Sequence, residues 1–413
     1  MRYSYILFLL FIPAFSLAQD IDYVRNQAEI LSADKMYGRG YVKKGMDKAA
    51  KHIASEFKAM GIETFDNSPY QNIEYAVNSF PKKIHITVND QELISGKDFL
   101  LSPESGSTRG TYTAFNIDKA ALKDLPHPKD LIGKIVLLDN SGIENKDSLG
   151  LFYQLREIYA EHLPVIWVNN DRLIWSVARR KMKNGIIEVN PGLIKEGDEI
   201  KIKFKSKWLD DFKTKNVIGY VKGTEFPDSF IVFTGHYDHL GMMGKKACFN
   251  GANDNASGVA FLMSMAKYYV NNPSKCSIAF IAFTGEEAGL IGSKYYTQNP
   301  IFPLEKIKFL LNMDLLGFGE DGITIVNATL HERAFSILNE INEKEDLLVK
   351  IKKRGPAANS DHYWFEEAGV PSFFMYTMGD SKAYHDVYDR YETLTFGEYN
   401  DIFKLIRTFI EKL

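Results

Sequence analysis

The chain has 413 residues, of which 45% are hydrophobic and 25% charged, as is typical of a folded globular protein. A formal net charge of -3, with no Arg-rich run or basic helix, argues against a nucleic-acid partner. At this length we expect two domains, or one large α/β domain with an insertion.

The N-terminal segment has the pattern of a secretory signal peptide. Arg2 precedes an apolar run over residues 5–15, and residues 16–18 (Ser-Leu-Ala) form a small-x-small cleavage site. The run is shorter than the roughly 20 residues that a membrane-spanning helix needs. We therefore predict cleavage of residues 1–18 near Ala18, no membrane span, and a mature chain that is secreted or periplasmic.

Helical periodicity follows the signal, at residues 21–31 and 46–60, and Gly61 stands where a helix C-cap is expected. From about residue 76 the pattern changes to short alternating runs broken by Gly, Pro, Asn and Asp. These runs predict strands at 84–88, 111–115, 134–138 and 164–168, and a helix at 148–160. We interpret residues 76–208 as an inserted, mainly β module without a metal-ligand cluster of its own.

From residue 216 the chain alternates strand, loop and helix, as a doubly wound sheet does. The expected strands are 216–221, 229–234, 277–284, 307–311, 323–326 and 373–376. The expected helices are 257–270, 289–298, 331–342, 360–368 and 395–413. The predicted fold is thus α/β: a mixed, mostly parallel sheet flanked by helices, with the β module inserted.

The chain has two cysteines, Cys248 and Cys276, too few for a disulfide framework. Cys276 precedes the predicted strand 277–284, whereas Cys248 lies in a loop at the opposite end of the sheet. A strand of about eight residues is roughly 25 Å long, far beyond the ~7 Å Cα separation that a disulfide spans. We therefore expect two free thiols.

Candidate metal ligands follow the predicted strands at the sheet edge where open α/β folds bind ligands. After four apolar strands come, in turn, His236 with Asp238, Glu286 with Glu287, Asp314, and His385. Asp254 opens the helix at 257–270. Imidazole and carboxylate ligands in this arrangement favour a divalent metal, zinc first.

The number of these ligands favours two ions. Two histidines and at least three carboxylates exceed the three protein ligands of one catalytic zinc. A pair of ions about 3.5–4 Å apart shares a bridging carboxylate in aminopeptidases, nucleases and phosphatases alike. Because Glu286 and Glu287 are adjacent, their side chains diverge, so one can bind metal while the other acts as a general base.

The segments HYDHLG, GANDNASGVA, FTGEEAGLIGS, NMDLLG and YHDVYD, in this order, resemble the two-zinc aminopeptidase family. Its wider clan includes glutamate carboxypeptidase, the transferrin receptor and glutaminyl cyclases. The resemblance covers residues 19–75 and 209–413 and implies a zinc peptidase domain there. Residues 76–208 stand where many members carry a protease-associated domain, and residues 130–137 resemble one of its strands.

The resemblance also implies a ligand set. His236 and Asp314 would hold one zinc, Glu287 and His385 would hold the other, and Asp254 would bridge them.

Further roles follow from the same resemblance. Asp238 would orient His236, and Glu286 would move a proton from the attacking water to the leaving amine. Tyr384 matches a tyrosine that hydrogen-bonds the oxyanion in some relatives; a packed aromatic side chain is the alternative. Relatives have a cis peptide after the bridging aspartate, so we expect Asp254–Asn255 to be cis.

Three other groups are given structural roles. His239 is expected to support the site or to lie in its loop. The segment Ser360-Asp361-His362 has the order of a helix cap. His331 opens a helix, and the sequence indicates no carboxylate partner for it.

The sequence therefore predicts a hydrolase that cleaves peptides, a zinc metalloprotease of the aminopeptidase type. The alternatives are a one-zinc glutaminyl cyclase, a carboxypeptidase of the same clan, and a binding protein with a decayed site. The HYDHLG and GANDNASGVA segments favour the peptidase branch over the cyclase, and the intact ligand positions argue against decay. The preferred substrate side chain and the oligomeric state stay open.

Overall fold

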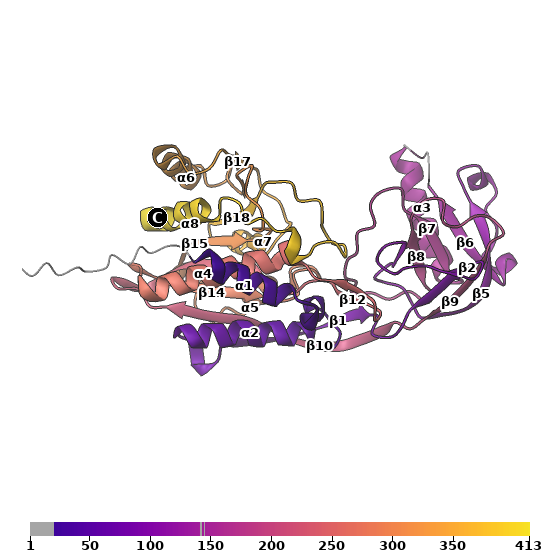
Figure 1. Ribbon diagram of the computed structural model, residues 1–413, viewed down its shortest axis with the longest axis horizontal. Helices are drawn as coiled ribbons and strands as arrows, with labels where there is room; N and C mark the ends of the chain where they lie inside the picture. Colours follow the sequence, from indigo (N-terminus) through magenta and orange to yellow (C-terminus); the bar gives the residue numbers. More distant parts are fainter. Residues whose placement is uncertain (1–19, 141–142, 144) are drawn as a thin grey trace, which may run out of the picture.

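The computed structural model describes residues 20–140, 143 and 145–413, so the predicted signal peptide lies outside the described residues. The fold consists of two eight-stranded sheets, a two-stranded hairpin and flanking helices (Figure 1). Helices cover both faces of the first sheet, and the second sheet lies at the opposite end of the molecule. The predicted α/β fold class is confirmed.

The first sheet has a block of four parallel strands at its centre. Its strands are β1 (Tyr70–Ser79), β10 (Lys207–Val221), β11 (Phe226–His236), β14 (Cys276–Phe283), β15 (Ile307–Met313), β16 (Ile323–Val326), β17 (Ile351–Lys353) and β18 (Ser372–Thr377). Their order is β1-β10-β14-β11-β15-β18-β16-β17. Strands β14, β11, β15 and β18 are parallel to their neighbours in this block, whereas β10 and β16 flank it in antiparallel pairing. The carboxyl ends of the four central strands therefore meet at one edge of the sheet.

Helices cover both faces of this sheet because its strands are apolar on both faces. On β11, Ile231 and Phe233 point into one core, and Phe230 and Val232 point into the other. The first core contains residues of α1 (Ile21–Ser32), α2 (Gly45–Met60), α4 (Gly258–Asn271), α6 (Glu332–Glu345) and α8 (Tyr399–Lys412). The second contains residues of α5 (Ile291–Gln298) and α7 (His362–Glu367).

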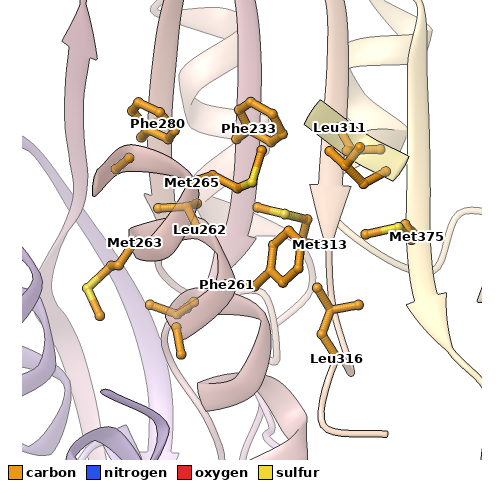
Figure 2. Packing of buried hydrophobic residues seen from close by; sticks show 14 of the residues in the cluster. Phe233, Phe261, Leu262, Met263, Met265, Phe280, Leu311, Met313, Leu316 and Met375 are labelled. Carbon is orange, nitrogen blue, oxygen red and sulfur yellow. The ribbon is translucent and has the colours of Figure 1, made fainter. Parts of the chain in front are cut away.

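Helix α4 is the centre of the larger core. Figure 2 shows Phe261 and Met265 of α4 beside Phe233 and Met313 of the sheet. The Phe233 ring stacks on that of Phe280, with centroids 5.8 Å apart. Each fully buried side chain of this size contributes about 1.5–3 kcal/mol. Helix α4 is thus firmly held at its N-terminal end, where Asp254 precedes it.

The second sheet is built from the residues between β1 and β10. Its strands are β2 (His85–Val88), β3 (Gln91–Glu92), β4 (Phe99–Leu101), β5 (Thr108–Ile117), β6 (Lys134–Asp139), β7 (Val165–Val168), β8 (Ile186–Val189) and β9 (Glu199–Phe204), in the order β3-β2-β9-β5-β6-β7-β8-β4. Helix α3 (Lys146–Ala160) packs on one face through Phe152 and Leu155. The other face shares a core with Phe249 of the hairpin β12 (Gly241–Met243) and β13 (Ala247–Phe249).

Strands β1 and β10 connect the two sheets. They pair antiparallel from Tyr70 opposite Val217 to Ser79 opposite Lys207. Strand β10 begins at Lys207, nine residues before the predicted strand 216–221. The prediction missed this first half because it has no continuous apolar run and none of its residues before Thr214 is buried. The division of the chain into domains at residues 76 and 208 stays a prediction.

The remaining elements are short. Turns of 3₁₀-helix occupy Asp34–Arg39, Phe65–Asn67, Ala121–Lys123, Pro128–Leu131, Leu304–Lys306 and Tyr391–Thr393, and Ala252–Ser257 forms a π-helical turn. Gly61 caps α2 in the left-handed conformation, as predicted. Cys248 and Cys276 are free and buried, which confirms the prediction. Among the described residues, no helix combines the length and apolar character needed to cross a bilayer.

Candidate metal centre

The carboxyl ends of the central strands bring the predicted ligands together. They are His236 at the end of β11, Glu287 after β14, Asp314 after β15, His385 in the loop after β18, and Asp254 in the π-helical turn before α4. Glu286, the predicted base, precedes Glu287. His236, Asp254 and Asp314 are buried, and Glu286, Glu287 and His385 are partly buried.

The Asp254 carboxylate lies between two pairs of side chains. Its Oδ1 is 3.3 Å from His236 Nε2, which is 3.4 Å from Asp314 Oδ1. Its Oδ2 is 3.0 Å from His385 Nε2, which is 3.2 Å from Glu287 Oε2. Each carboxylate oxygen of Asp254 therefore faces its own histidine–carboxylate pair.

His239 lies beside the second pair. Its Nδ1 is 2.6 Å from Glu287 Oε1 and 3.9 Å from Asp254 Oδ1. The ring is fully buried, and its Nε2 has no hydrogen-bond partner among the described residues. His239 thus holds one oxygen of Glu287 while the other faces His385. The three groups His239, Asp254 and Glu287 are also close enough to share an ion.

Two buried charged residues hold the turn that carries Asp254. Asp389 accepts hydrogen bonds from the backbone N–H groups of Asn253 (2.7 Å) and Asp254 (3.0 Å). The fully buried Arg39 donates to the carbonyl oxygens of Leu31, Tyr237, Asn250, Gly251 and Asp254. These contacts fix the backbone of the bridging position from both sides.

The backbone of this turn is itself unusual. The Asp254–Asn255 peptide bond is cis, as predicted. Gly251 has φ +57°, and a Cβ atom there would lie 2.1 Å from the Asp254 carbonyl oxygen. Only glycine therefore fits at position 251.

Asp238 connects the first histidine to the acidic pair after β14. Its carboxylate accepts hydrogen bonds from the backbone N–H groups of Glu286 (3.2 Å) and Glu287 (3.3 Å). His236 Nδ1 lies 3.1 Å from the Asp238 carbonyl oxygen but 3.8 Å from its carboxylate. The carbonyl, rather than the expected carboxylate, is thus the nearer acceptor for His236. Burial raises the pKa of Asp238 to about 7.

Glu286 is the acidic residue left outside the two pairs. Burial raises the pKa of Glu286 well above its usual range, and the negative charges of Glu287, Asp361 and Asp314 act in the same direction. The His236 ring acts against this rise. A carboxyl group of raised pKa holds a proton more tightly than an ordinary carboxyl group, as a group that takes up and later releases a proton must.

Residues 216–410, which carry all of these strand ends, match peptidase family M28. We call residues 216–410 the M28 segment, after the family that they match. Arg39, helices α1 and α2, and the second sheet lie outside the matched residues.

Two curated relatives show the range of proteins to which the chain is similar. Aminopeptidase YwaD of Bacillus subtilis is 27% identical over 293 residues, which are 67% of this chain and 61% of that protein. The glutamate carboxypeptidase 2 homolog of Caenorhabditis elegans is 29% identical over 236 residues, which are 49% of this chain and 29% of that protein. The chain thus spans less than two thirds of the length of either relative.

A solved structure shares the whole fold. The zinc aminopeptidase BSAP from Bacillus subtilis superposes with a TM-score of 0.70 at 19% identity, over 95% of this chain and 94% of that one. Because this superposition covers 95% of this chain, that protein shares the fold of both sheets.

The donor atoms of the M28 segment fit zinc. In each histidine–carboxylate pair, the histidine nitrogen lies 3.0–3.4 Å from the oxygens of Asp254 and of its partner carboxylate. These separations match the ~3.3 Å edges of a tetrahedron with metal–ligand bonds of 2.0–2.1 Å. Asp314 Oδ1 is buried and has no hydrogen-bond partner among the described residues. A buried carboxylate oxygen without a partner is costly, and a cation would satisfy it.

The loop that supplies His385 differs from the other ligand positions because it contacts Trp175, in the connection between β7 and β8 of the second sheet. His385 has φ +53°, and its Nδ1 lies 3.1 Å from the Trp175 carbonyl oxygen. The Tyr384 ring stacks on the His385 ring, with centroids 4.0 Å apart, and 45% of Tyr384 is exposed. Tyr384 is therefore at the surface of the M28 site rather than packed in a core.

Two expectations about residues near the site need correction. His331 does have a carboxylate partner: its Nε2 lies 2.8 Å from Glu366 Oε2, on a helix 35 residues further along the chain. Asp361 precedes α7 but its side chain makes no capping hydrogen bond. Ser360 instead donates to Asp314 Oδ2 at 3.1 Å, so this segment supports a predicted ligand.

Sequence reasoning missed Arg39, Asp389 and Trp175. Asp389 lies in the YHDVYD segment, where a second acidic residue four positions after His385 was an available signal. Arg39 stands between two glycines in a loop, and an arginine there is ordinarily a surface residue. Nothing in the sequence near Trp175 indicates a contact with the site.

Proposed function

We propose that the protein is a secreted or periplasmic zinc aminopeptidase that hydrolyses the N-terminal peptide bond of peptides. The observation that carries this proposal is the position of Asp254, whose two oxygens face separate histidine–carboxylate pairs. Aminopeptidases are among the enzymes that use a carboxylate to bridge two ions. The M28 match and the similarity to aminopeptidase YwaD support the same reaction.

In this proposal each pair would hold one zinc ion together with Asp254. His236 and Asp314 form the first subsite, and His385 and Glu287 form the second. Zinc bound there supplies Lewis-acid activation of water and of the scissile carbonyl group.

The residues of the chain then handle the proton. Glu286 accepts a proton from the attacking water and delivers it to the nitrogen of the leaving amine as the carbon–nitrogen bond breaks. Asp238 holds Glu286 in place through the hydrogen bond from its backbone N–H. Tyr384, exposed beside His385, would donate a hydrogen bond to the oxyanion.

A carboxypeptidase is the second candidate, because one relative is named a glutamate carboxypeptidase homolog. A one-zinc glutaminyl cyclase is less well supported. A cyclase uses the amine of its own substrate as the nucleophile and needs no attacking water, whereas the proposal assigns Glu286, which lies outside the two histidine–carboxylate pairs, to activate one.

A short peptide panel tests the proposal. Peptides that begin with Leu, Phe, Asp or Gln would be incubated with the full-length protein, each with a free and an acetylated N-terminus. We expect free amino acids from unblocked peptides and none from acetylated ones. Release of the C-terminal residue from acetylated peptides would establish a carboxypeptidase, and pyroglutamate with ammonia from the Gln peptide alone would establish a cyclase.

The proposal also includes the organisation of the chain. Residues 19–75 and 209–413 would form the peptidase domain, and residues 76–208 the inserted module. Residues 1–18 would be a signal peptide. The N-terminal residue of protein exported by a bacterial host, read by mass spectrometry, should be Gln19.

A further inference from the structure

The loop from Tyr384 to Asp389 carries the second predicted histidine ligand and lies against residues that belong to the second sheet and its connections. His385 makes two hydrogen bonds to one residue there. Its Nδ1 lies 3.1 Å from the Trp175 carbonyl oxygen, and its own carbonyl oxygen accepts the Trp175 N–H at 2.9 Å. The ring and the backbone of His385 are therefore both fixed by Trp175.

Trp175 is in turn anchored in the core beside the second sheet. Its indole Nε1 donates a hydrogen bond of 2.8 Å to the carbonyl oxygen of Leu101, the last residue of β4. Its ring stacks on Phe249, with centroids 4.6 Å apart, and 5% of the residue is exposed. The backbone of Trp175 thus has little freedom to move away from His385.

Two further contacts tie the same loop to this part of the chain. The Arg172 guanidinium forms an ion pair with the Asp386 carboxylate and donates to the Lys382 carbonyl oxygen. Gly96 packs closely against Val387, because a Cβ atom at Gly96 would lie 2.8 Å from Val387 Cγ1. Three consecutive residues of the loop are therefore braced by residues from between β1 and β10.

These contacts bear on the ligand atom of His385. When Nδ1 carries the proton and donates it to the Trp175 carbonyl, Nε2 keeps its lone pair and points at Asp254 and Glu287. A partner on the second ring nitrogen is what sets the tautomer and orientation of a metal-binding histidine.

We infer that Arg172 and Trp175 are positioning residues for His385, so that the inserted residues complete the second metal subsite of the M28 segment. Among the described residues, the hydrogen bonds of the first subsite stay within the M28 segment: His236 ends β11 and contacts the Asp238 carbonyl, and Asp314 follows β15 and accepts from Ser360. This inference rests on the two-ion site of the proposed function. It adds that the two ions depend on different parts of the chain: the ligands of the second ion are held partly by residues from between β1 and β10, and those of the first ion are not.

The test is a zinc titration of the full-length protein. The two dissociation constants would be measured by competition with a chromogenic chelator, for the wild type and for Arg172→Ala, Arg172→Glu, Arg172→Lys and Gly96→Ala. Arg180→Ala is the matched control, since Arg180 pairs with Glu104 and Glu157 and not with the loop. Thermal unfolding of the metal-free proteins would show that each variant is folded.

We expect one zinc to bind about 10- to 100-fold more weakly in Arg172→Ala, which is the usual effect of losing a group that orients a ligand. The other zinc should keep its wild-type affinity. Arg172→Glu should be worse than Arg172→Ala, because it places two negative charges together, and Arg172→Lys should recover part of the loss. Gly96→Ala should also weaken only one zinc, and Arg180→Ala should weaken neither.

The inference would be overturned if Arg172→Ala and Gly96→Ala both bound their two zinc ions within about twofold of the wild-type affinities. It would also be overturned if these variants weakened the binding of both ions equally. Failure of the proposed function looks different. Wild-type protein that binds two zinc ions but cleaves no peptide would contradict the function alone. Wild-type protein that is fully active with one ion would contradict the two-ion site, and the inference with it.

Discussion

Replacing Asp389 by asparagine should weaken zinc binding without removing any predicted ligand. Asp389 is 1% exposed, and its two oxygens accept the N–H groups of Asn253 and Asp254 at 2.7 and 3.0 Å. An asparagine side chain of the same shape has one oxygen and one NH₂ group. One of the two backbone N–H groups would therefore face a donor instead of an acceptor.

The size of the effect follows from that lost contact. A hydrogen bond to a charged group contributes about 1.5–3 kcal/mol. If the turn around Asp254 is no longer held, the first zinc ion to bind has to order it. Its affinity should then fall by about 10- to 150-fold, since about 1.4 kcal/mol corresponds to a factor of ten. The second ion meets a turn that is already ordered and should be affected less.

The same chelator competition measures this change. Asp380→Asn is a suitable control, because Asp380 lies in the segment between β18 and His385 and its side chain is 84% exposed. An Asp389→Asn protein whose tighter zinc binds as in the wild type would show that Asp389 does not hold the bridging position.

Two further predictions concern the base and the thiols. Glu286→Gln should lower kcat by about 10²–10⁴-fold while both zinc ions stay bound, and a Glu286→Gln protein with wild-type kcat would exclude Glu286 as the base. Burial raises the pKa of Cys248 to about 11 from a reference of 9.0, which lowers its thiolate fraction at pH 8 by about 100-fold. Alkylation of native protein at pH 8 should therefore leave Cys248 unmodified, whereas denatured protein should show two reactive thiols. Rapid modification of Cys248 in the native protein would contradict the burial of this residue.

The strand ends could be predicted because they depend on local patterns. The apolar run at 277–284 and the acidic pair Glu286 and Glu287 are neighbours in the sequence, and parallel strands present their carboxyl ends at one edge. The same reasoning located His236 and Asp314. These residues lie together in the structure because the topology of the sheet brings them together.

The residues that hold this site could not be predicted, because their contacts join distant parts of the chain. Arg39 donates to the carbonyl of Asp254, 215 residues away. Trp175 and His385 are 210 residues apart. Glu366 was not foreseen as the partner of His331 for the same reason. A backbone carbonyl can accept from any donor that the fold supplies, so it leaves no signal in the residue types around it.

The pairing of β1 with β10 has a consequence for how such a chain could arise. Ser79 and Lys207 face each other at the end of this antiparallel pair, so all residues from 80 to 206 form, in topological terms, the loop of a β-hairpin. The entropy of closing a loop grows slowly with its length, so a hairpin can accept a very long loop at modest cost. A two-residue turn between Ser79 and Lys207 would restore the minimal hairpin. The shortened protein would keep the whole first sheet, but His385 would lose both hydrogen bonds to Trp175. A chain of that form would keep every predicted metal ligand, and under the inference above its second zinc would bind more weakly.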